Sequence, residues 1–372
     1  MGRTRKAILS DLVGFRTITP FGDDAIDYCA HFLERIGFVC TRLRCDDVSN
    51  LYAKLGNHRK NLCFAGHVDV VPPLDGWTTD PFMLTEEDGK LYGRGTNDMK
   101  GPLSSCLTAI RDFVTTTSSY GFSISIILTS NEEIGGSTGT RQIVEFLKNT
   151  GERITGCVLC ESCSRVTAGG YVKIGCRGSL NVDLTSHGYQ AHVANGNELG
   201  NHLHSFVRFL HSFTETPLDG GSAKFAPSSI QLTSVDVGND VRNVIPQIAT
   251  AKLNIRFNDR WDVDGLEAHI RSQTPDNIDI AFERLGYPFI GSRDEFVSFV
   301  CNAIENTTNK APSVGTDGGN SDALYIREIT DVVEVGSLIT GAHIVNEFIT
   351  EEELGKLKNI YLGIINHFKD LA

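Results

Sequence analysis

The stretch Leu62-Cys63-Phe64-Ala65-Gly66-His67-Val68-Asp69 runs from a short apolar segment directly into a histidine and an aspartate two positions apart. A short apolar run bounded in this way fits a buried strand. Side chains two apart on an extended chain project to the same side, so the imidazole of His67 can bind a metal ion while Asp69 orients it. Taken alone, the pair is better explained by a polar surface turn that leads into Pro72 and Pro73.

Three further apolar runs repeat this pattern, at residues 123–128, 154–160 and 331–335. Before them, residues 24–36 place apolar side chains at the spacing of one helix face. Strands that alternate with helices predict an α/β fold with a layered, mixed sheet rather than a sandwich or a helical bundle. The nearly continuous apolar character of residues 124–128 is typical of a strand that is covered on both faces.

The order of the elements changes from about residue 178. The expected elements are then a strand at 180–186, a helix at 202–213, strands at 230–237 and 248–257, a helix at 263–272 and a strand at 278–283. This is the split βαβ order of a ferredoxin-like α+β domain. We therefore expect a larger domain formed by residues 1–177 and 287–372, with a smaller domain of residues 178–286 inserted into it.

The composition limits the possible classes of function. Among 372 residues, 34 Lys and Arg stand against 46 Asp and Glu, a formal net charge of −12, which excludes a general nucleic-acid-binding role. No run of about 18 apolar residues is present, so no transmembrane helix is expected. Asp11 interrupts the first apolar segment too early for a secretory signal, which favours a cytoplasmic protein. A chain of this length needs no disulfide framework, so its ten cysteines are expected to be reduced.

Asp98 and the pair Glu132 and Glu133 each have a simple structural explanation. Asp98 lies in the turn Arg94-Gly95-Thr96-Asn97-Asp98-Met99-Lys100-Gly101, before a helix expected near Pro102, and an aspartate there commonly caps the helix. Glu132 and Glu133 follow the run at 123–128 and fit a solvated charged turn. Neighbouring side chains on an extended chain face opposite ways, however, so one acid can bind a metal ion while the other transfers a proton.

The interpretation changes when all the polar residues that follow strands are taken together. The candidate metal ligands are His67, Asp98, Glu133, Glu161 and His343. Ligands bind at the carboxyl ends of sheet strands in open α/β folds, so these side chains are expected to meet there. Two imidazoles and three carboxylates suit a pair of Zn²⁺ ions if one carboxylate bridges them. Glu132 is then free to act as general base toward water and to deliver the proton to a departing amine, and Asp69 to orient His67.

A row of cysteines offers a competing interpretation. Cys157, Cys160 and Cys163 form two successive CxxC spacings, which resemble a thiolate metal or iron–sulfur site. The next cysteine, Cys176, lies too far along the chain to complete such a site, and Cys157 and Cys160 are expected on opposite faces of a strand. Structural cysteines are therefore favoured, with a thiolate-cluster redox protein as the alternative.

Other polar residues are suited to binding a substrate. His192 lies in an expected loop of the inserted domain, where it is either a surface histidine or a hydrogen-bond donor to a substrate oxygen. Donors suited to carboxylate recognition are present at Arg177, Ser179, Asn243, Arg256, Gly319 and Asn320. Taken alone, Arg256 is better explained as an ion-pair residue on a strand face.

The sequence resembles the zinc aminoacylase and carboxypeptidase-like metallohydrolases over essentially the whole chain. The resemblance rests on residues 66–73, 77–82, 91–95, 98–101 and 177–179, and on His343 with Asn346 and Glu347. It implies a zinc-peptidase-like catalytic domain with an inserted ferredoxin-like dimerisation domain, through which two copies form a homodimer. It also implies two Zn²⁺ ions per subunit, replaceable by Co²⁺, and hydrolysis of a small-molecule amide. The double proline Pro72-Pro73 and the block at 318–322 favour N-succinyl-LL-2,6-diaminopimelate as substrate over N-acetylornithine or dipeptides.

The resemblance also implies a role for each candidate residue. His67 and Glu161 would hold one zinc ion, Glu133 and His343 the other, Asp98 would bridge them, and Glu132 would be the base. His192 would reach the neighbouring subunit's site and stabilise the tetrahedral oxyanion. The substrate carboxylates would contact Arg177, Ser179, Asn243, Arg256, Gly319 and Asn320.

One segment departs from the family pattern. The family usually has Gly-Glu-Pro-Thr where this chain has Cys160-Glu161-Ser162-Cys163, so the ligand is kept while its neighbours change. The alternative outside the enzymes is a metal-dependent binding protein, which the loss of Glu132 or of a ligand would mark. Each of those positions is occupied here by a competent residue, which favours an enzyme.

Overall fold

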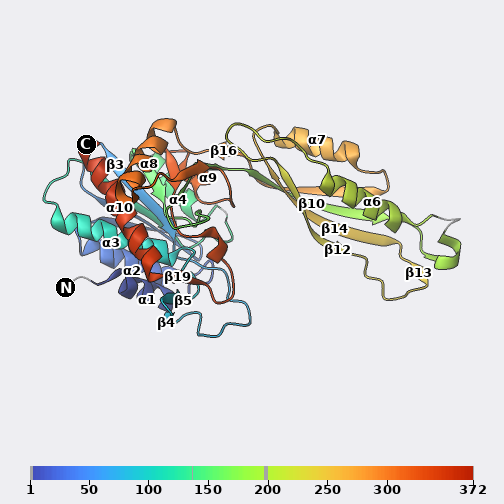
Figure 1. Ribbon diagram of the computed structural model, residues 1–372, viewed down its shortest axis with the longest axis horizontal. Coiled ribbons are helices and arrows are strands. Elements are labelled where there is room, and N and C mark those ends of the chain that lie inside the picture. The colour runs from blue at the N-terminus through green and yellow to red at the C-terminus, as the bar shows by residue number, and fades with distance from the viewer. Residues whose placement is uncertain (1–2, 136, 197–199, 372) are drawn as a thin grey trace. The chain divides into compact units, whose positions relative to one another are not determined.

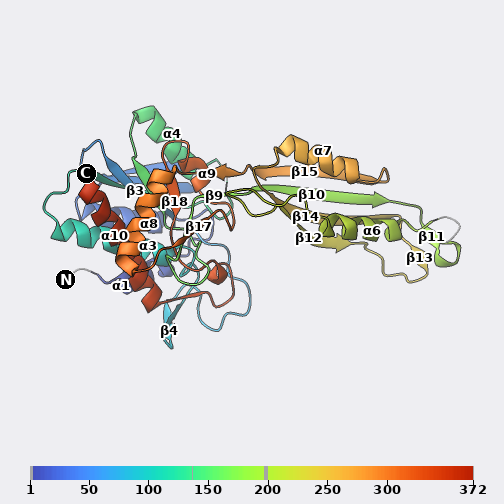
Figure 2. The same ribbon diagram turned by 45° about the horizontal axis from the view of Figure 1, so that its top comes forward.

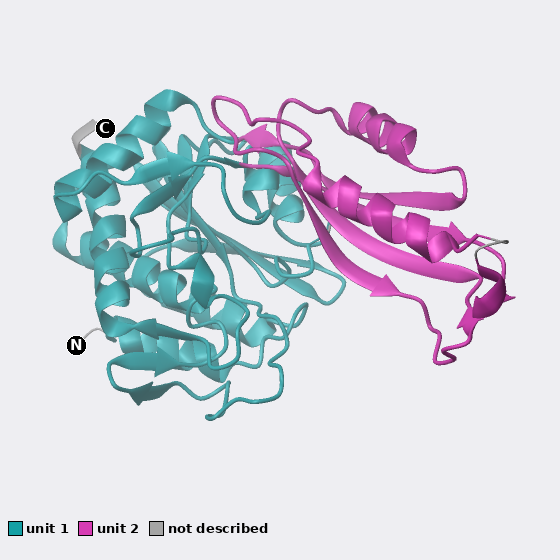
Figure 3. Cartoon of the chain, turned by 45° about the vertical axis from the view of Figure 1, so that its right-hand side comes forward, with its two compact units in different colours: residues 1–175, 291–372 teal, residues 176–290 magenta. Residues whose placement is uncertain are grey.

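The computed structural model describes residues 3–135, 137–196 and 200–371, shown as ribbons in Figure 1. The chain divides into two compact units, coloured separately in Figure 3. One unit comprises Met1–Gly175 with Gly291–Ala372, and the other comprises Cys176–Ile290. The second unit is therefore an insertion into the first. In the described part of the chain, no helix is long and apolar enough to cross a membrane.

The first unit contains most of the helices and strands. In chain order, its elements are α1 (Arg5–Gly14), α2 (Asp23–Glu34), β1 (Val39–Cys45), β2 (Val48–Leu55), β3 (Asn61–His67), β4 (Thr85–Glu87), β5 (Lys90–Tyr92), α3 (Lys100–Thr116), β6 (Ser123–Thr129), α4 (Thr140–Thr150), β7 (Gly156–Leu159) and β8 (Tyr171–Lys173). After the insertion follow α8 (Asp294–Thr308), β17 (Ser313–Gly315), α9 (Ala323–Ile326), β18 (Val332–Glu334), β19 (Phe348–Thr350) and α10 (Glu351–Leu371). The short strands β9 (Gly175–Cys176) and β16 (Phe289–Ile290) pair with each other where the two units join along the chain.

An eight-stranded mixed sheet forms the centre of this unit, in the order β1-β2-β6-β3-β7-β18-β8-β17. The pairs β6–β3, β3–β7, β7–β18 and β8–β17 are parallel, whereas β1–β2, β2–β6 and β18–β8 are antiparallel. Every residue of β3 and β6 is buried, which is the reason for their nearly continuous apolar sequence. The predicted α/β fold with a mixed sheet is confirmed, and the predicted runs correspond to β3, β6, β7 and β18.

Helices cover this sheet in separate groups. Helix α10 packs against both α3 and α8, while α4 packs against α9 and several strands (Figure 2). The hairpin β1–β2 at the sheet edge was not predicted, because every residue of β1 is exposed or half-buried and no apolar run marks it. The small sheet β19-β5-β4 was likewise not predicted, since each of its strands has three residues.

The second unit is an antiparallel sheet with two helices. Its elements are β10 (Gly178–His187), β11 (Ala191–His192), α6 (His202–Glu215), β12 (Ser229–Asp236), β13 (Val244–Ile245), β14 (Ile248–Phe257), α7 (Val263–Gln273) and β15 (Ile278–Gly286). The four longer strands are ordered β12-β14-β10-β15, with antiparallel pairing throughout. Numbered along the chain this is the order 2-3-1-4, the arrangement of a ferredoxin-like sheet.

The alternating pattern of β14 explains how this small sheet is built. Its buried positions are every second residue, from Ala249 to Phe257, and they join Leu180 and Phe206 in the core. The intervening residues, such as Lys252, lie on the other face, which is solvated. One layer of helices thus suffices for this unit, as the sequence pattern predicted.

Candidate metal centre

Three adjacent strands deliver the first ligand candidates to one edge of the large sheet. His67 is the last residue of β3, which lies between β6 and β7 and runs parallel to both. Glu132 and Glu133 follow β6, and Glu161 follows β7. Because the carboxyl ends of parallel strands meet at the same edge, residues far apart in sequence are brought together.

Asp98 reaches this edge from a tight turn before α3. Met99, not Asp98, is the N-cap residue of α3, and it makes no side-chain capping bond. The cap explanation for Asp98 is therefore wrong. Gly101 allows the turn to close, because a Cβ atom there would lie 2.0 Å from the carbonyl oxygen of Thr96. The carboxylate of Asp98 is thereby left available for other partners.

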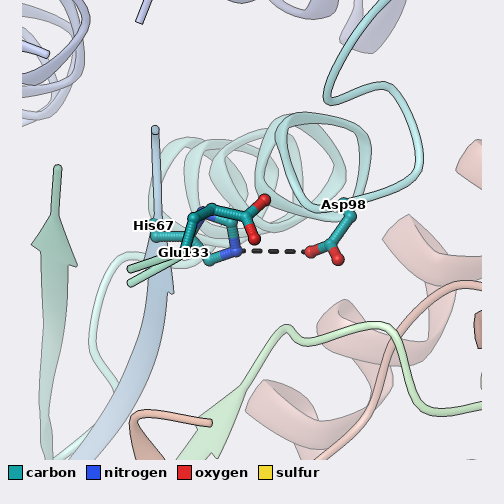
Figure 4. A group of neighbouring side chains, drawn as sticks. All are labelled: His67, Asp98 and Glu133. Atoms are coloured by element: carbon teal, nitrogen blue, oxygen red, sulfur yellow. Dashed lines mark hydrogen bonds and ion pairs between the residues drawn. The ribbon is translucent and has the colours of Figure 1, made fainter. Parts of the chain in front are cut away.

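The two oxygens of Asp98 face two different histidines. Asp98 Oδ1 lies 3.3 Å from His67 Nε2, and Asp98 Oδ2 lies 3.4 Å from His343 Nε2. Figure 4 shows Asp98 pointing toward His67, with Glu133 beside them. Each histidine also has a further carboxylate: His343 Nε2 is 2.8 Å from Glu133 Oε2, and His67 Nε2 is 3.7 Å from Glu161 Oε2. All five candidate ligands thus lie in one cluster, with Asp98 in the middle.

The donor atoms of this cluster fit divalent metal ions. Ligand atoms of His67, Asp98 and Glu133 all lie within 4.8 Å of one another. Glu133 Oε1 and Glu161 Oε2 are buried and have no hydrogen-bond partner among the described residues. Unpartnered carboxylate oxygens are costly to bury unless they coordinate a cation. Imidazole nitrogens and carboxylate oxygens are also ligands that zinc accepts.

The pKa shifts within the cluster also favour bound cations. Burial by itself lowers the pKa of His67, but hydrogen bonds with Asp69 and Asp98 outweigh this effect and hold it well above its ordinary value. Hydrogen bonds with Asp98 and Glu133 raise the pKa of His343 to about 10. Burial, together with the nearby charge of Asp98, raises the pKa of Glu161 well above its usual range. The site therefore concentrates negative charge that bound cations would offset.

Glu132 lies beside the ligand cluster rather than within its closest contacts. Its Oε2 is 4.0 Å from His67 Nε2, farther than the distances that join the candidate ligands. Burial raises its pKa well above the usual range of a glutamate. A carboxylate with a raised pKa next to a metal cluster is suited to taking up a proton.

Asp69 positions more of the site than the sequence suggested. Its Oδ2 accepts hydrogen bonds from Thr19 Oγ1 at 2.7 Å and from the backbone N–H groups of Glu132 and Glu133, both at 3.1 Å. The ring Nδ1 of His67 lies 3.0 Å from the backbone oxygen of Asp69 and 3.5 Å from its carboxylate. Asp69 therefore orients both the imidazole and the turn that carries the two glutamates.

Replacing Asp69 by Asn is expected to weaken the binding of a divalent metal ion, with Zn²⁺ as the probe, roughly 10- to 100-fold, the usual effect of removing a partner that orients a ligand. An amide offers one accepting oxygen where the carboxylate offers two, so with the oxygen at the Oδ2 position the contacts of Oδ1 with the backbone N–H of Glu132 and with His67 Nδ1 are lost. Competition with a chromophoric chelator measures the affinity. Asp219→Asn is the matched control, because Asp219 accepts backbone hydrogen bonds from Gly221 and Ser228 in the other unit. Equal zinc affinities in the two variants would contradict this role.

The expected substrate contacts fall into three groups. Within the second unit, Ser179 pairs with Arg256 across β10 and β14, near Arg177 in the chain. In the same unit, His192 pairs with Val244 across β11 and β13, and Val193 donates to the backbone oxygen of Asn243, so His192 and Asn243 lie side by side. Gly319 and Asn320 belong to the first unit and are exposed.

A buried ion pair that the sequence did not reveal supports the loop of Gly319. Lys173 on β8 donates to Glu334 on β18 at 2.8 Å and to the backbone oxygen of Gly319 at 2.7 Å. Ser321 donates to the other oxygen of Glu334 at 2.6 Å. Both charged side chains are almost fully buried. Since 161 residues separate Lys173 from Glu334, no local pattern could have indicated the pair.

We expect Lys173→Met to lower the free energy of unfolding by about 3–5 kcal/mol, because it leaves Glu334 buried without its cation. Chemical denaturation measures the change. Lys148→Met removes an exposed pair with Glu328 and should cost no more than about 1 kcal/mol. A loss for Lys173→Met as small as that of the control would show that the buried pair is not stabilising.

The cysteine row does not form a metal site. Among the described residues, the one group with metal-binding geometry is that of His67, Asp98 and Glu133. Burial raises the pKa of Cys163 to about 12 and that of Cys157 well above its ordinary value. A raised pKa favours the protonated thiol, which agrees with structural cysteines.

Comparison with known proteins agrees with this geometry. The model of peptidase family M20/M25/M40 matches residues 63–367. A succinyl-diaminopimelate desuccinylase of Rhodospirillum centenum is 38% identical over 372 residues, which cover 97% of this chain and 96% of the relative.

Solved structures show the same fold. An M20 family metallo-carboxypeptidase from Sulfolobus solfataricus aligns with a TM-score of 0.77 at 17% identity, covering 99% of this chain and 100% of that one. A dinuclear metal-binding peptidase of the M20 family from Bacillus subtilis aligns with a TM-score of 0.69 at 13% identity, covering 99% and 98%. Together with the family match and the near full-length relative, these likenesses show that this chain belongs to peptidase family M20/M25/M40, whose peptidases are metal-dependent.

Proposed function

We propose that the protein is a dizinc amidohydrolase that cleaves N-succinyl-LL-2,6-diaminopimelate to succinate and LL-2,6-diaminopimelate, in the synthesis of lysine and meso-diaminopimelate. The observation that carries the dizinc proposal is the position of Asp98, whose two oxygens face His67 and His343 separately. The substrate is supported by the near full-length relative, which is named a succinyl-diaminopimelate desuccinylase.

In this proposal the ligands divide into two sets that share Asp98. His67 and Glu161 hold one zinc ion, and Glu133 with His343 holds the other, in agreement with the distances within each pair. Co²⁺ is expected to substitute, because it accepts the same nitrogen and oxygen ligands. When bound, the two cations supply Lewis acidity toward the amide carbonyl and the attacking water.

The chain's own residues handle the protons and the orientation. Glu132 takes a proton from the attacking water through Oε2 and returns it to the departing amine nitrogen. Asp69 holds Glu132 in place through the backbone N–H of that residue and keeps the His67 ring oriented. Arg177, Ser179, Asn243, Arg256, Gly319 and Asn320 bind the carboxylates of the substrate.

We further propose that two copies of the chain form a homodimer through the inserted domain expected at residues 178–286. This domain corresponds to the second unit, Cys176–Ile290. Strand β12 is the last strand of its sheet and, among the residues that the structure describes, pairs with β14 alone, so it offers an unpaired edge. Leu232 and Val235 on this strand are 40% and 49% exposed, and Val207 on α6 is 61% exposed. An unpaired edge with exposed apolar side chains suits pairing with a second copy. His192 of the partner subunit then donates to the oxyanion that forms at the substrate carbonyl.

A cytoplasmic location is part of the proposal. The thiols of Cys29, Cys63, Cys106, Cys157, Cys160 and Cys163 are buried and form no disulfide. Reduced cysteines in this number are typical of a reducing compartment.

The test is hydrolysis by protein stripped of metal with a chelator and then titrated with Zn²⁺. Cleavage of N-succinyl-LL-2,6-diaminopimelate that is absent without metal and is restored as zinc is added, with full activity at two ions per chain, is the expected result. N-acetylornithine and a dipeptide are assayed in parallel. A preference for either of them would replace the substrate assignment and keep the amidohydrolase. Two bound zinc ions without hydrolysis of any N-acyl amino acid or peptide would favour a metal-dependent binding protein.

A further inference from the structure

A second buried ion pair, between Glu347 and Arg94, connects two segments that carry residues of the ligand cluster. It has no role in the function proposed above. Glu347 follows His343 by four residues, and its carboxylate is fully buried with 0% exposure. Arg94, in the turn that leads to Asp98, is 1% exposed and donates to Glu347 Oε2 at 2.8 Å. The pair therefore joins the two segments that carry Asp98 and His343.

Within the described residues, the hydrogen bonds of the Glu347 carboxylate all come from the turn of Asp98. Oε1 accepts from the backbone N–H groups of Asn97 at 2.8 Å and Asp98 at 3.0 Å. Oε2 accepts from the backbone N–H of Gly95 at 3.0 Å in addition to Arg94. Both oxygens thus face donors only, and they fix the backbone at Asp98 itself.

The same pair also holds the segment of His343. Arg94 Nη1 donates to the backbone oxygen of Ile344 at 3.2 Å, next to His343. His343 and Asn346 adopt positive φ angles of 61° and 57°, which are costly for residues other than glycine and need support from their surroundings. The anchoring at Ile344 and Glu347 supplies that support on either side of Asn346.

We propose that Glu347, together with Arg94, is a positioning pair that fixes Asp98 relative to His343 and so sets the affinity of the metal site formed by Asp98, Glu133 and His343. This inference rests on the proposed dizinc centre. Neither residue touches the metal or the substrate in this role, so the pair acts through the ligands that it holds. Removing it should weaken the His343 site more than the site of His67 and Glu161, because His67 is held independently by β3 and Asp69.

Glu347→Gln tests the inference with almost no change of shape. A glutamine must turn its NH₂ group toward the N–H donors on one side or the other, since no acceptor faces either oxygen. The zinc content after dialysis against buffered Zn²⁺, and the stepwise affinities from chelator competition, are the readouts. The wild type is expected to bind two ions, and Glu347→Gln to bind the ion held by Glu133 and His343 roughly 10- to 100-fold less tightly.

Glu334→Gln is the matched control, because Glu334 is an equally buried partner of an ion pair in the same unit and accepts from Lys173 and Ser321. Both variants should lose thermal stability, but Glu334→Gln should keep both zinc affinities. If Glu347→Gln does not fold, Arg94→Lys provides the milder change, since a lysine keeps the charge but its ammonium group is one bond nearer to Cα than Arg94 Nη1, which now bonds both Glu347 and Ile344. Unchanged zinc affinities in the variant that folds, beside a wild type with two ions, would overturn the inference. A wild type that binds fewer than two ions would instead overturn the dizinc proposal.

Discussion

Glu132→Gln is expected to lower turnover by about 10²- to 10⁴-fold, the contribution of a well-placed general base. The substitution keeps the size of the side chain and removes its ability to accept a proton. Glu132 Oε2 is 4.0 Å from His67 Nε2, so replacing the carboxylate by an amide should leave the contacts among the candidate ligands in place. Steady-state kinetics with the zinc-loaded protein measures turnover, and metal analysis of the same sample measures the zinc content, which should not change.

Glu133, the next residue along the chain, provides a contrast to Glu132. Glu133 Oε2 lies 2.8 Å from His343 Nε2, within the ligand cluster, so Glu133→Gln should lose zinc as well as activity. Glu132→Gln is thus expected to keep its zinc and Glu133→Gln to lose it, while both variants have similarly low turnover. Nearly full activity in zinc-loaded Glu132→Gln would show that another group moves the proton.

The central part of the fold could be predicted because burial leaves a strong local signal. Strands β3 and β6 are buried at every residue, so each appears as an apolar run. Strand β14 alternates buried and outward-facing residues, which indicated a one-sided sheet. Strand β1 carries neither signal, because it lies at the sheet edge and is buried at none of its positions. The three-residue strands β8 and β17 are too short for any period to be recognised.

The ligand types were predictable for a similar reason, since acids and histidines directly follow the buried runs. Their mutual geometry was not, because it depends on turns with no periodic pattern. The separate contacts of the two Asp98 oxygens require the turn closed at Gly101, and that turn is held by Glu347, about 250 residues away. Side chains that support a site from such sequence distances leave no local mark, so the sequence singles out Glu347 only as part of a motif.

His192→Ala is expected to lower kcat by about 10²- to 10³-fold, the usual effect of removing one oxyanion donor, with zinc content unchanged. The ring Nδ1 of His192 accepts a hydrogen bond from the backbone N–H of Ala194 at 3.1 Å. A neutral imidazole in that arrangement carries its proton on Nε2, which is therefore free to donate. His187→Ala is the control, because His187 is an exposed histidine of the same unit that pairs with Asp279.

Mixing two inactive variants then tests both the proposed homodimer and the action of His192 across it. In a heterodimer of Glu132→Gln and His192→Ala subunits, one site would combine an intact Glu132 with an intact His192 of the partner subunit, and the other site would lack both. Random reassociation makes half of the dimers mixed, so about a quarter of wild-type activity should return. If His192 served the site of its own subunit, every site in the mixture would lack one group. The mixture would then be no more active than the separate variants, and the role of the partner subunit would be excluded.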